Sequence, residues 1–265
     1  MEIKSYEIVV ARYNEDISWL LNVNKKWKIT IYNKGLPFEK IGSIKMRNPN
    51  IDIINIENKG REAETYVYHM LHRYNNYADL TVFIQADPFT HAPEMKELLE
   101  VLANKTTLDP ATEKYIPMTI CYDLAKNVPP REICEQRQNR FFRVEDISPY
   151  TLDCLVYIDQ PVHYFGYEYR KIYNKPITTN IIKDFFEQIG IDHKYTNIDK
   201  YLQFNYAACF AVPKYSLMQY DKDVYERMYT KTFSNKIMPW IFERSWLTIF
   251  DSTFDSSNIL ADYKK

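Results

Sequence analysis

The chain has 265 residues, 46% of them hydrophobic, and a formal net charge of −1. This length and composition predict a folded core and exclude extensive disorder, and the near-zero charge does not indicate a dedicated nucleic-acid binder. Neither a signal-peptide pattern nor an apolar run of ~18 residues is present, and four separated cysteines at positions 121, 134, 154 and 209 indicate free thiols. We therefore expect a cytoplasmic protein without a membrane span.

Strand and helix patterns alternate through the first 104 residues. Strands are predicted at 6–12, 27–33, 51–56 and 80–86, and helices at 15–23, 61–75 and 93–104, with a loop after 33 that contains Gly35, Pro37 and Gly42. The run LTVFIQA at 80–86 is continuously apolar, which suits a strand covered on both faces. The alternation predicts an α/β fold with a doubly wound, mostly parallel sheet flanked by helices.

The second half of the chain is less regular. Residues 105–175 are expected to form loops and short strands, with a helix near 130–139. Further helices are predicted at 178–189, 221–234 and 238–250, and a buried strand at 204–212. We expect a single domain over residues 1–251, followed by a polar tail at 252–265.

Polar clusters follow three of the predicted strands. The first strand is followed by RYNED at 12–16, the third by NKGRE at 58–62, and the fourth ends in QADPFTH at 85–91. Ligands of doubly wound sheets bind outside the carboxyl ends of the strands. Because parallel strands end at the same edge, the three clusters are expected to meet there.

The first cluster has two interpretations. Either Asn14 or Asp16 caps the next helix and the other side chains are solvated, or the cluster forms part of a nucleotide pocket. In the second case Tyr13 stacks on a base, and Asn14 or Glu15 hydrogen-bonds it.

The second cluster lies where a strand turns into a helix. Gly60 is expected there for a positive φ or for close approach of a ligand. Arg61 is unfavourable at a helix start, since the helix dipole prefers anions, but it would suit a bound phosphate; an ordinary surface arginine is the alternative. Glu62, Thr65 and His69 are expected on the polar face of the helix.

The third cluster places a carboxylate at the end of a buried strand. Asp87 in that place can hold Mg²⁺ or Mn²⁺ while diphosphate oxygens fill the remaining positions. The alternative is a turn in which Asp87 binds local backbone. His91 is a metal ligand, a substrate contact or a plain loop residue.

A fourth candidate lies in PWIFERSWLTIF at 239–250. Glu243 is surrounded there by Trp240, Phe242 and Trp246, and a carboxylate is costly to bury unless it is paired or used. Glu243 and Arg244 are adjacent, so we expect them to point in different directions. Glu243 is then a candidate general base, and a structural ion pair is the alternative.

Together these segments resemble a family of uncharacterised proteins. VVARYNEDISWL, NKGREAETYVYH, FIQADPFTH, CFAVPKYSL and FERSW follow its pattern ARYNED, N-x-GREA-x-TY with a following His, FLQGDPF-x-H and ERxW. The resemblance extends from residue 7 to 250 and is weakest over 105–195. That family is in turn similar to GT-A-type glycosyltransferases, which implies a GT-A-like (Rossmann-like) fold.

The resemblance implies a nucleotide-binding half at 1–104 and an acceptor-side half at 105–251. In the GT-A enzymes an acidic D-x-D motif holds a divalent metal on the sugar nucleotide, and a late acidic residue is the base in inverting members. Asp87 would then be the final acid of D-x-D, holding Mn²⁺ or Mg²⁺ with His91, although Gln85 replaces the first acid. Glu243 would be the base and Arg61 the diphosphate contact. The other implied donor-side residues are Arg12, Tyr13, Asn14, Glu15, Gly60, Glu62 and Gln85, with His69, Arg244 and Trp246 as acceptor contacts or support.

The predicted function is transfer of a sugar from a nucleotide-sugar donor to an acceptor hydroxyl, metal-assisted and inverting. The acceptor, a glycan or another hydroxyl-bearing molecule, would lie against the aromatic-rich second half. A metal-dependent hydrolase using Asp87, His91 and either His69 or His72 is one alternative. A non-catalytic carbohydrate-binding protein is the other, favoured by the missing first acid. Nucleic acid is not an expected partner.

Overall fold

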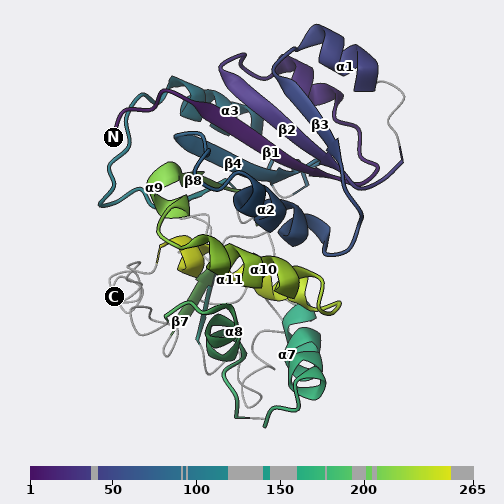
Figure 1. Ribbon diagram of the computed structural model, residues 1–265, viewed down its shortest axis with the longest axis vertical. Coiled ribbons are helices and arrows are strands. Elements are labelled where there is room, and N and C mark those ends of the chain that lie inside the picture. The colour runs from purple at the N-terminus through teal and green to yellow at the C-terminus, as the bar shows by residue number, and fades with distance from the viewer. Residues whose placement is uncertain are drawn as a thin grey trace.

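The computed structural model describes residues 1–36, 41–90, 92–93, 95–118, 140–143, 160–176, 178–192, 201–204 and 208–251, with backbone alone for 41–43, 140–143, 160–163 and 201–204. These residues form a six-stranded sheet with helices on both faces, and a second layer of helices beneath it (Figure 1). A separate two-stranded ribbon pairs β6 (Arg140–Arg143) with β7 (Tyr201–Phe204).

The large sheet has the strand order β3-β2-β1-β4-β8-β5. Its parallel strands are β1 (Tyr6–Arg12), β2 (Trp27–Asn33), β3 (Ile51–Asn55) and β4 (Leu80–Gln85). Two antiparallel strands from the second half complete it, β8 (Phe210–Pro213) and β5 (Ile116–Pro117). The predicted mostly parallel α/β sheet is therefore confirmed, and the chain changes direction across the sheet between β1 and β4.

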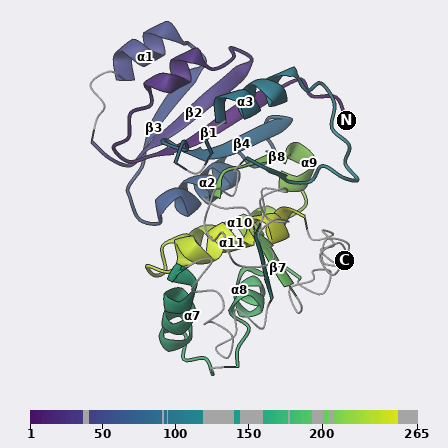
Figure 2. The same ribbon diagram turned by 180° about the vertical axis from the view of Figure 1, so that it is seen from behind.

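Helices cover both faces of this sheet (Figures 1 and 2). One face carries the 3-10 helix η1 (Ser18–Asn22), α1 (Ile41–Arg47) and α3 (Met95–Asn104). The other carries α2 (Arg61–His72), with α10 (Lys222–Thr232) and α11 (Met238–Phe250) packed on α2. Successive residues of β4 enter the two cores in turn, Phe83 on the α2 side and Val82 and Ile84 on the α3 side, which explains the continuous apolar run.

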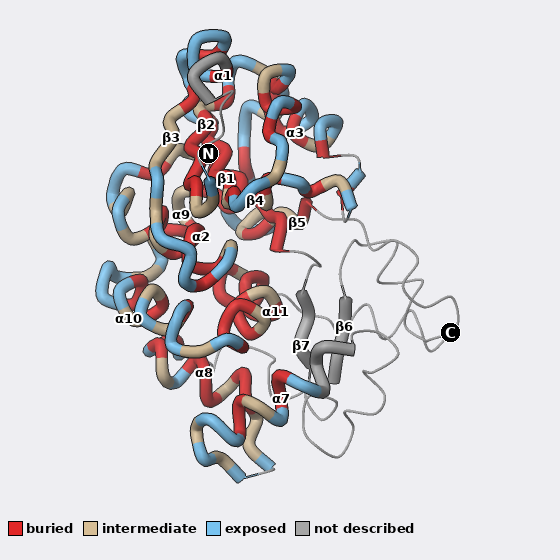
Figure 3. Tube along the Cα trace, turned by 90° about the vertical axis from the view of Figure 1, so that its right-hand side faces the viewer, coloured by how far each residue is buried: buried red, intermediate tan, exposed pale blue. Residues whose placement is uncertain are grey.

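The second layer of helices holds α7 (Gln160–Ile172) and α8 (Ile181–Ile189). The side chain of Asn180 caps α8 by accepting from Lys183 N at 3.1 Å, and Gly190 ends it in the left-handed conformation at φ 75°. The short helix α9 (Lys214–Leu217) follows β8 directly. In Figure 3, β1, β4 and most of α11 are coloured as buried, in accord with their side chains. No helix in the described parts of the chain is both long and apolar enough to span a bilayer.

Several predicted elements differ from the structure. The helix expected at 15–23 is only the 3-10 helix η1, and the expected loop after 33 contains α1, whose short sequence IGSIKMR is masked by neighbouring Gly and Pro signals. The strand expected at 204–212 begins at Phe210, because Ala208 adopts a left-handed φ of 50° that ends any ladder. Helix α7 was not predicted, since Pro161 and Gly166 interrupt its pattern. The predicted helix at 130–139 and tail at 252–265 lie outside the described residues.

Candidate functional site

The loops that follow β1 and β2 are joined by Arg12. Its guanidinium donates to the carbonyl oxygens of Glu15 at 3.0 Å, Tyr13 at 3.2 Å and Leu36 at 3.2 Å, and to Oδ1 of Asn33. The side chain is only 3% exposed. Arg12 therefore fixes the shape of the strand ends, and these contacts give it a supporting position behind the surface where a nucleotide was predicted.

The next residues form the surface of that loop. The ring of Tyr13 is 51% exposed, so it is free to meet a planar ligand. Asn14 accepts from Leu36 N at 3.1 Å and Glu15 accepts from Tyr13 N at 2.7 Å. The carboxylate of Asp16 accepts from Ser18 N and Oγ, both at 2.9 Å, in a local turn just before η1, whose N-cap residue is Ile17 without a side-chain capping bond.

Gly35 allows the β1 and β2 loops to touch. A Cβ at this position would lie 1.7 Å from the carbonyl oxygen of Tyr13, so any side chain would push the two loops apart. This contact was not predicted, because it depends on two segments 22 residues apart that only the parallel pairing of β1 and β2 brings together.

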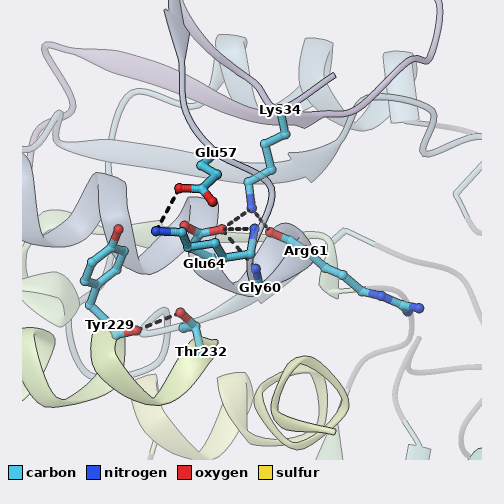
Figure 4. A network of polar contacts seen from close by, with 8 residues as sticks. Lys34, Glu57, Gly60, Arg61, Glu64, Tyr229 and Thr232 are labelled. Atoms are coloured by element: carbon cyan, nitrogen blue, oxygen red, sulfur yellow. Dashed lines mark hydrogen bonds and ion pairs between the residues drawn. The ribbon is translucent and has the colours of Figure 1, made fainter. Parts of the chain in front are cut away.

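A buried ion pair anchors the turn between β3 and α2 (Figure 4). Lys34 Nζ lies 2.7 Å from Glu64 Oε2, and the two side chains are only 3% and 2% exposed. The same carboxylate oxygen accepts from Lys59 N at 3.1 Å and Gly60 N at 3.0 Å, and Lys34 Nζ also donates to the carbonyl oxygen of Arg61. Burial lowers the pKa of Lys34, and the bond to Glu64 opposes that shift.

The backbone at Gly60 and Arg61 differs from the prediction. Gly60 has φ −129°, and Arg61 is the residue with a left-handed φ, at 52°. Gly60 is needed because a Cβ would lie 2.7 Å from the carbonyl oxygen of Thr232 and 2.8 Å from Cβ of Glu64. A left-handed non-glycine residue costs of order 1–3 kcal/mol and is held by its surroundings, here by the Lys34–Glu64 pair.

The Arg61 side chain leaves this network and points towards α11. In Figure 4 it extends away from Lys34 and Glu64, and its guanidinium lies 5.3 Å from the ring centroid of Trp240. The side chain is exposed. A cation over an aromatic face keeps its outer edge open to an anion, so the placement suits the predicted phosphate contact.

Two hydrogen bonds fix the backbone just after β4, and the carboxylate that follows it, Asp87, is exposed. Trp19 Nε1 donates to Ala86 O at 2.9 Å, and Ala86 N donates to Ala11 O at 3.0 Å. Asp87, the next residue, is exposed. His91, its predicted partner, lies outside the described residues. Within the described residues, no three His, Cys, Asp or Glu side chains are close enough together to hold a metal ion.

Helix α11 corrects the prediction for Glu243 and Arg244. The two adjacent side chains do not diverge but form an ion pair, with Arg244 Nη1 3.0 Å from Glu243 Oε2. Arg244 Nη1 also donates to Trp240 O at 3.1 Å, and its guanidinium lies 4.8 Å from the ring centroid of Phe165. Because both side chains are long and flexible, two adjacent residues of a helix can still meet, and their positions in the sequence alone do not show this.

The surroundings of Glu62 perturb the pKa of its carboxyl. It lies in the first turn of α2 and is partly buried. Burial, reinforced by the negative charge of Glu243, raises the pKa of Glu62 from 4.5 to about 7. Burial likewise raises the pKa of Cys209 to about 12, with further increases from Glu62 and Glu243. Residues from α2, α11 and the start of β8 therefore lie close together at the carboxyl edge of the sheet.

Two predicted support residues are interior. Trp246 is fully buried and lies 5.4 Å from Phe210 between ring centroids. His69 is a fully buried residue of α2, and its Nδ1 lies 3.1 Å from Tyr32 Oη. Its Nε2 is 3.7 Å from Glu7 Oε2, a separation that would suit an ion pair, but burial lowers the pKa of His69 to about 3. The ring is therefore neutral near pH 7, and its contact with Glu7 is not an ion pair.

This position of His69 weakens the hydrolase alternative. Glu7, its neighbour, pairs with Thr81 in the first half of β4, whereas Asp87 follows the carboxyl end of that strand. His72 is exposed and stacks on Tyr68 at 3.8 Å between ring centroids. Neither histidine is brought to Asp87.

The sequence therefore located most of the strand-end residues but not their connections. Tyr13, Asn14, Glu15, Arg61, Glu62, Gln85 and Asp87 all follow or end strands at one edge of the sheet, or begin α2 there. The residues missed were Lys34, Glu64, Cys209 and Trp240. For Lys34 and Glu64 the available signal was a lysine directly after a buried strand and a glutamate in the first turn of an otherwise buried helix face.

Comparison with protein families places the chain in one of them. A family model described as "Protein of unknown function (DUF3431)" matches residues 8–259. The chain belongs to this family. The match begins within β1 and covers every later strand and helix that the structure describes, which confirms the expected membership in an uncharacterised family. Comparison with curated proteins gave no match.

Proposed function

We propose that this DUF3431 protein is a glycosyltransferase that moves a sugar from a nucleotide-sugar donor to an acceptor hydroxyl. One observation carries the proposal. An exposed tyrosine ring (Tyr13), an arginine (Arg61) and two acids (Glu62 and Asp87) follow the carboxyl ends of the strands, at the edge where the order switches between β1 and β4. Doubly wound sheets bind their ligands at this point. The order β3-β2-β1-β4 also follows that of dinucleotide-binding sheets.

The donor would be held by the loops after β1 and β3. Tyr13 offers an exposed ring for the base, with Asn14 and Glu15 beside it. Arg61, placed over Trp240, supplies positive charge for the diphosphate. Charge builds on that diphosphate as the bond to the anomeric carbon breaks, so a fixed guanidinium stabilises the transition state more than the ground state.

The described residues offer one carboxylate, Asp87, to a divalent cation at this site. Asp87 would hold Mn²⁺ or Mg²⁺ through one carboxylate, and diphosphate oxygens would supply most of the other ligands, as is common for Mg²⁺. The described residues contain no ready-made cluster of three ligands, so the cation would bind together with the donor. The chemistry that it would supply there is neutralisation of charge on the leaving diphosphate.

The transfer itself needs a base. The oxygen of the acceptor hydroxyl forms a bond to the anomeric carbon, the bond from that carbon to the diphosphate oxygen breaks, and the diphosphate leaves with the electron pair. The hydroxyl proton passes to a carboxylate. Glu243 was predicted for that role, and Glu62 stands beside it, so an inverting reaction with one carboxylate base is the mechanism we propose.

A thermal-shift screen of UDP-, GDP-, CMP- and TDP-linked sugars, each with Mn²⁺ and with EDTA, tests the function. Donor at about 100 times its dissociation constant should stabilise the fold by about 2.7 kcal/mol, or roughly 5 °C in Tm. Tyr13→Ala should remove the shift. The matched control Tyr167→Ala, which truncates a 62% exposed tyrosine on α7, should retain it. Release of the nucleoside diphosphate then measures turnover.

The outcomes separate the parts of the proposal. A shift with one donor that disappears in EDTA supports the transferase and the cation at Asp87. A shift that persists in EDTA supports the transferase without the cation. No shift with any donor rejects the transferase.

A non-catalytic carbohydrate-binding protein remains a second candidate. The observation that favours it is Gln85 in place of an acid, which leaves Asp87 as the carboxylate at the end of β4. Donor or glycan binding without release of nucleoside diphosphate, over a panel of sugar acceptors, would favour this candidate over the enzyme.

A further inference from the structure

Glu62 and Glu243 lie on two helices that pack against each other. Glu62 lies in the first turn of α2, just after the carboxyl edge of the sheet, and Glu243 lies on α11. The two helices pack on each other, and Arg61 reaches Trp240 at 5.3 Å across that contact. Tyr66 follows Glu62 by one helical turn, so the two side chains leave α2 on the same side.

Buried polar groups surround this pair of acids. Burial raises the pKa of Tyr66, and Cys209, Glu62, Tyr115 and Glu243 each raise it further, so each of these four groups is close enough to Tyr66 to act on it. Tyr66 is fully buried, yet its hydroxyl has no hydrogen-bond partner among the described residues. Trp246 Nε1 is in the same condition. Unpartnered buried donors are uncommon and call for an explanation, such as a group that binds there.

The two acids differ in their partners. Glu243 is engaged by Arg244 at 3.0 Å, and Arg244 is itself held by Trp240 O and by the ring of Phe165. Glu62 forms no ion pair within the described residues, although Arg61 and Lys34 lie near enough to favour its charged form. To accept a proton, Glu243 must give up its bond to Arg244, whereas Glu62 has no such bond to lose.

We propose that Glu62 is the residue that takes the proton from the acceptor hydroxyl, and that Glu243, held in its ion pair with Arg244, is a neighbouring negative charge and not the base. This assignment rests on the proposed transferase function and replaces Glu243 as the base. The proton moves from the attacking hydroxyl to a carboxylate oxygen of Glu62 as the new bond to the anomeric carbon forms. The unpartnered hydroxyl of Tyr66, one helical turn after Glu62, would donate to an oxygen bound beside Glu62.

The perturbation of Glu62 agrees with this role. A general base is most effective when its pKa lies near the working pH, and the pKa of Glu62 is raised to about 7. Burial is the largest cause, and Glu243 on α11 adds to it, while a bond from the backbone N–H of Glu62 itself and the charges of Arg61 and Lys34 act in the opposite direction. Adjacent acids held in unlike environments commonly divide into separate acid–base roles.

The first test measures the carboxyl directly and needs no substrate. In protein labelled with ¹³C at the glutamate carboxyls, infrared or NMR titration should show one glutamate that titrates near pH 7. Glu62→Gln should remove that signal, and Glu243→Gln should shift it to lower pH. The control Glu97→Gln, an exposed acid on α3, should leave it unchanged. A signal that survives in Glu62→Gln, or none between pH 6 and 8, would overturn the proposal.

The second test uses the donor found in the thermal-shift screen. Glu62→Gln should lower kcat by about 100-fold or more while the donor still stabilises the variant, and Glu62→Asp should restore part of the rate. Glu243→Gln should keep more activity than Glu62→Gln and move the acid limb of the pH–rate profile to lower pH. A Glu62→Gln variant with the wild-type rate would overturn the assignment of the base alone. Absence of binding by every donor would reject the transferase function and this role with it.

Discussion

The buried pair of Lys34 and Glu64 offers a sharp test of how the β3–α2 turn is built. Lys34→Met leaves the Glu64 carboxylate buried with Lys59 N and Gly60 N as its remaining donors among the described residues. Removing one partner of a buried ion pair typically costs about 3–5 kcal/mol. Since a domain is stable by only about 5–15 kcal/mol, the loss should be large. Glu64→Gln strands the buried ammonium of Lys34 and should cost a similar amount.

The double variant Lys34→Met/Glu64→Gln separates the charges from the hydrogen bonds. A glutamine oxygen still accepts from the two backbone N–H groups, and no buried charge remains. We therefore expect the double variant to be more stable than the sum of the single losses predicts, by about 2 kcal/mol or more.

Urea unfolding at pH 7, followed by tryptophan fluorescence, measures all three variants. Lys4→Met is the matched control, because Lys4 lies 3.2 Å from Glu2 in a pair that is 75% and 68% exposed; its cost should not exceed about 0.5 kcal/mol. A loss below about 1 kcal/mol for Lys34→Met, or strictly additive losses in the double variant, would refute the reasoning.

Three further predictions concern other residues of the site. Arg12→Lys should lower the free energy of unfolding by about 2 kcal/mol in the same assay, since a lysine cannot bond four acceptors at once, whereas exposed Arg47→Lys should change nothing measurable. The folded-state pKa of Glu62 is raised from 4.5 to about 7. The free energy of unfolding of the wild type, compared with that of Glu62→Gln, should therefore fall by about 3 kcal/mol as pH rises from 4.5 to 7.5. A difference between the two proteins that does not change with pH would contradict the raised pKa. Trp240→Ala should weaken donor binding by about 2- to 5-fold, because the contact of the ring with Arg61 is lost. Trp240→Phe should retain most of the affinity. Equal donor affinities for Trp240→Ala and Trp240→Phe would show that an aromatic ring at this position does not contribute to donor binding.

Local patterns carried much of the fold. The apolar runs of β1, β2 and β4 and the helical spacing of α2, α8, α10 and α11 are visible in the sequence, because burial on a sheet or on one helix face imposes a period on neighbouring residues. Elements without such a period were missed: α1 is short, and α7 is interrupted by Pro161 and Gly166. The start of β8 was placed six residues early, because Ala208 gives no sequence signal for its left-handed backbone.

The location of the candidate site could be predicted from the sequence, but the contacts between its residues could not. Polar residues after parallel strands must share one edge, so Tyr13, Arg61 and Asp87 were correctly placed at the strand ends. Arg12 follows the same pattern, yet its guanidinium is used by backbone carbonyls of two loops. Which polar group faces a ligand and which supports the loop depends on contacts between segments distant in sequence.

The sequence by itself determined the α/β class, the parallel strands and the edge at which their polar residues collect, because each follows from residue periodicity and from the geometry of a parallel sheet. Only the tertiary structure decided that Glu243 pairs with Arg244, that His69 is neutral in the interior, and that Glu62 shares its surroundings with Glu243 and Cys209. The physical reason is that charge states and partners are set by burial and by neighbours in space. Helix α11 and strand β8 come from positions far along the chain from the strand-end residues that they meet, and no local pattern records where they pack.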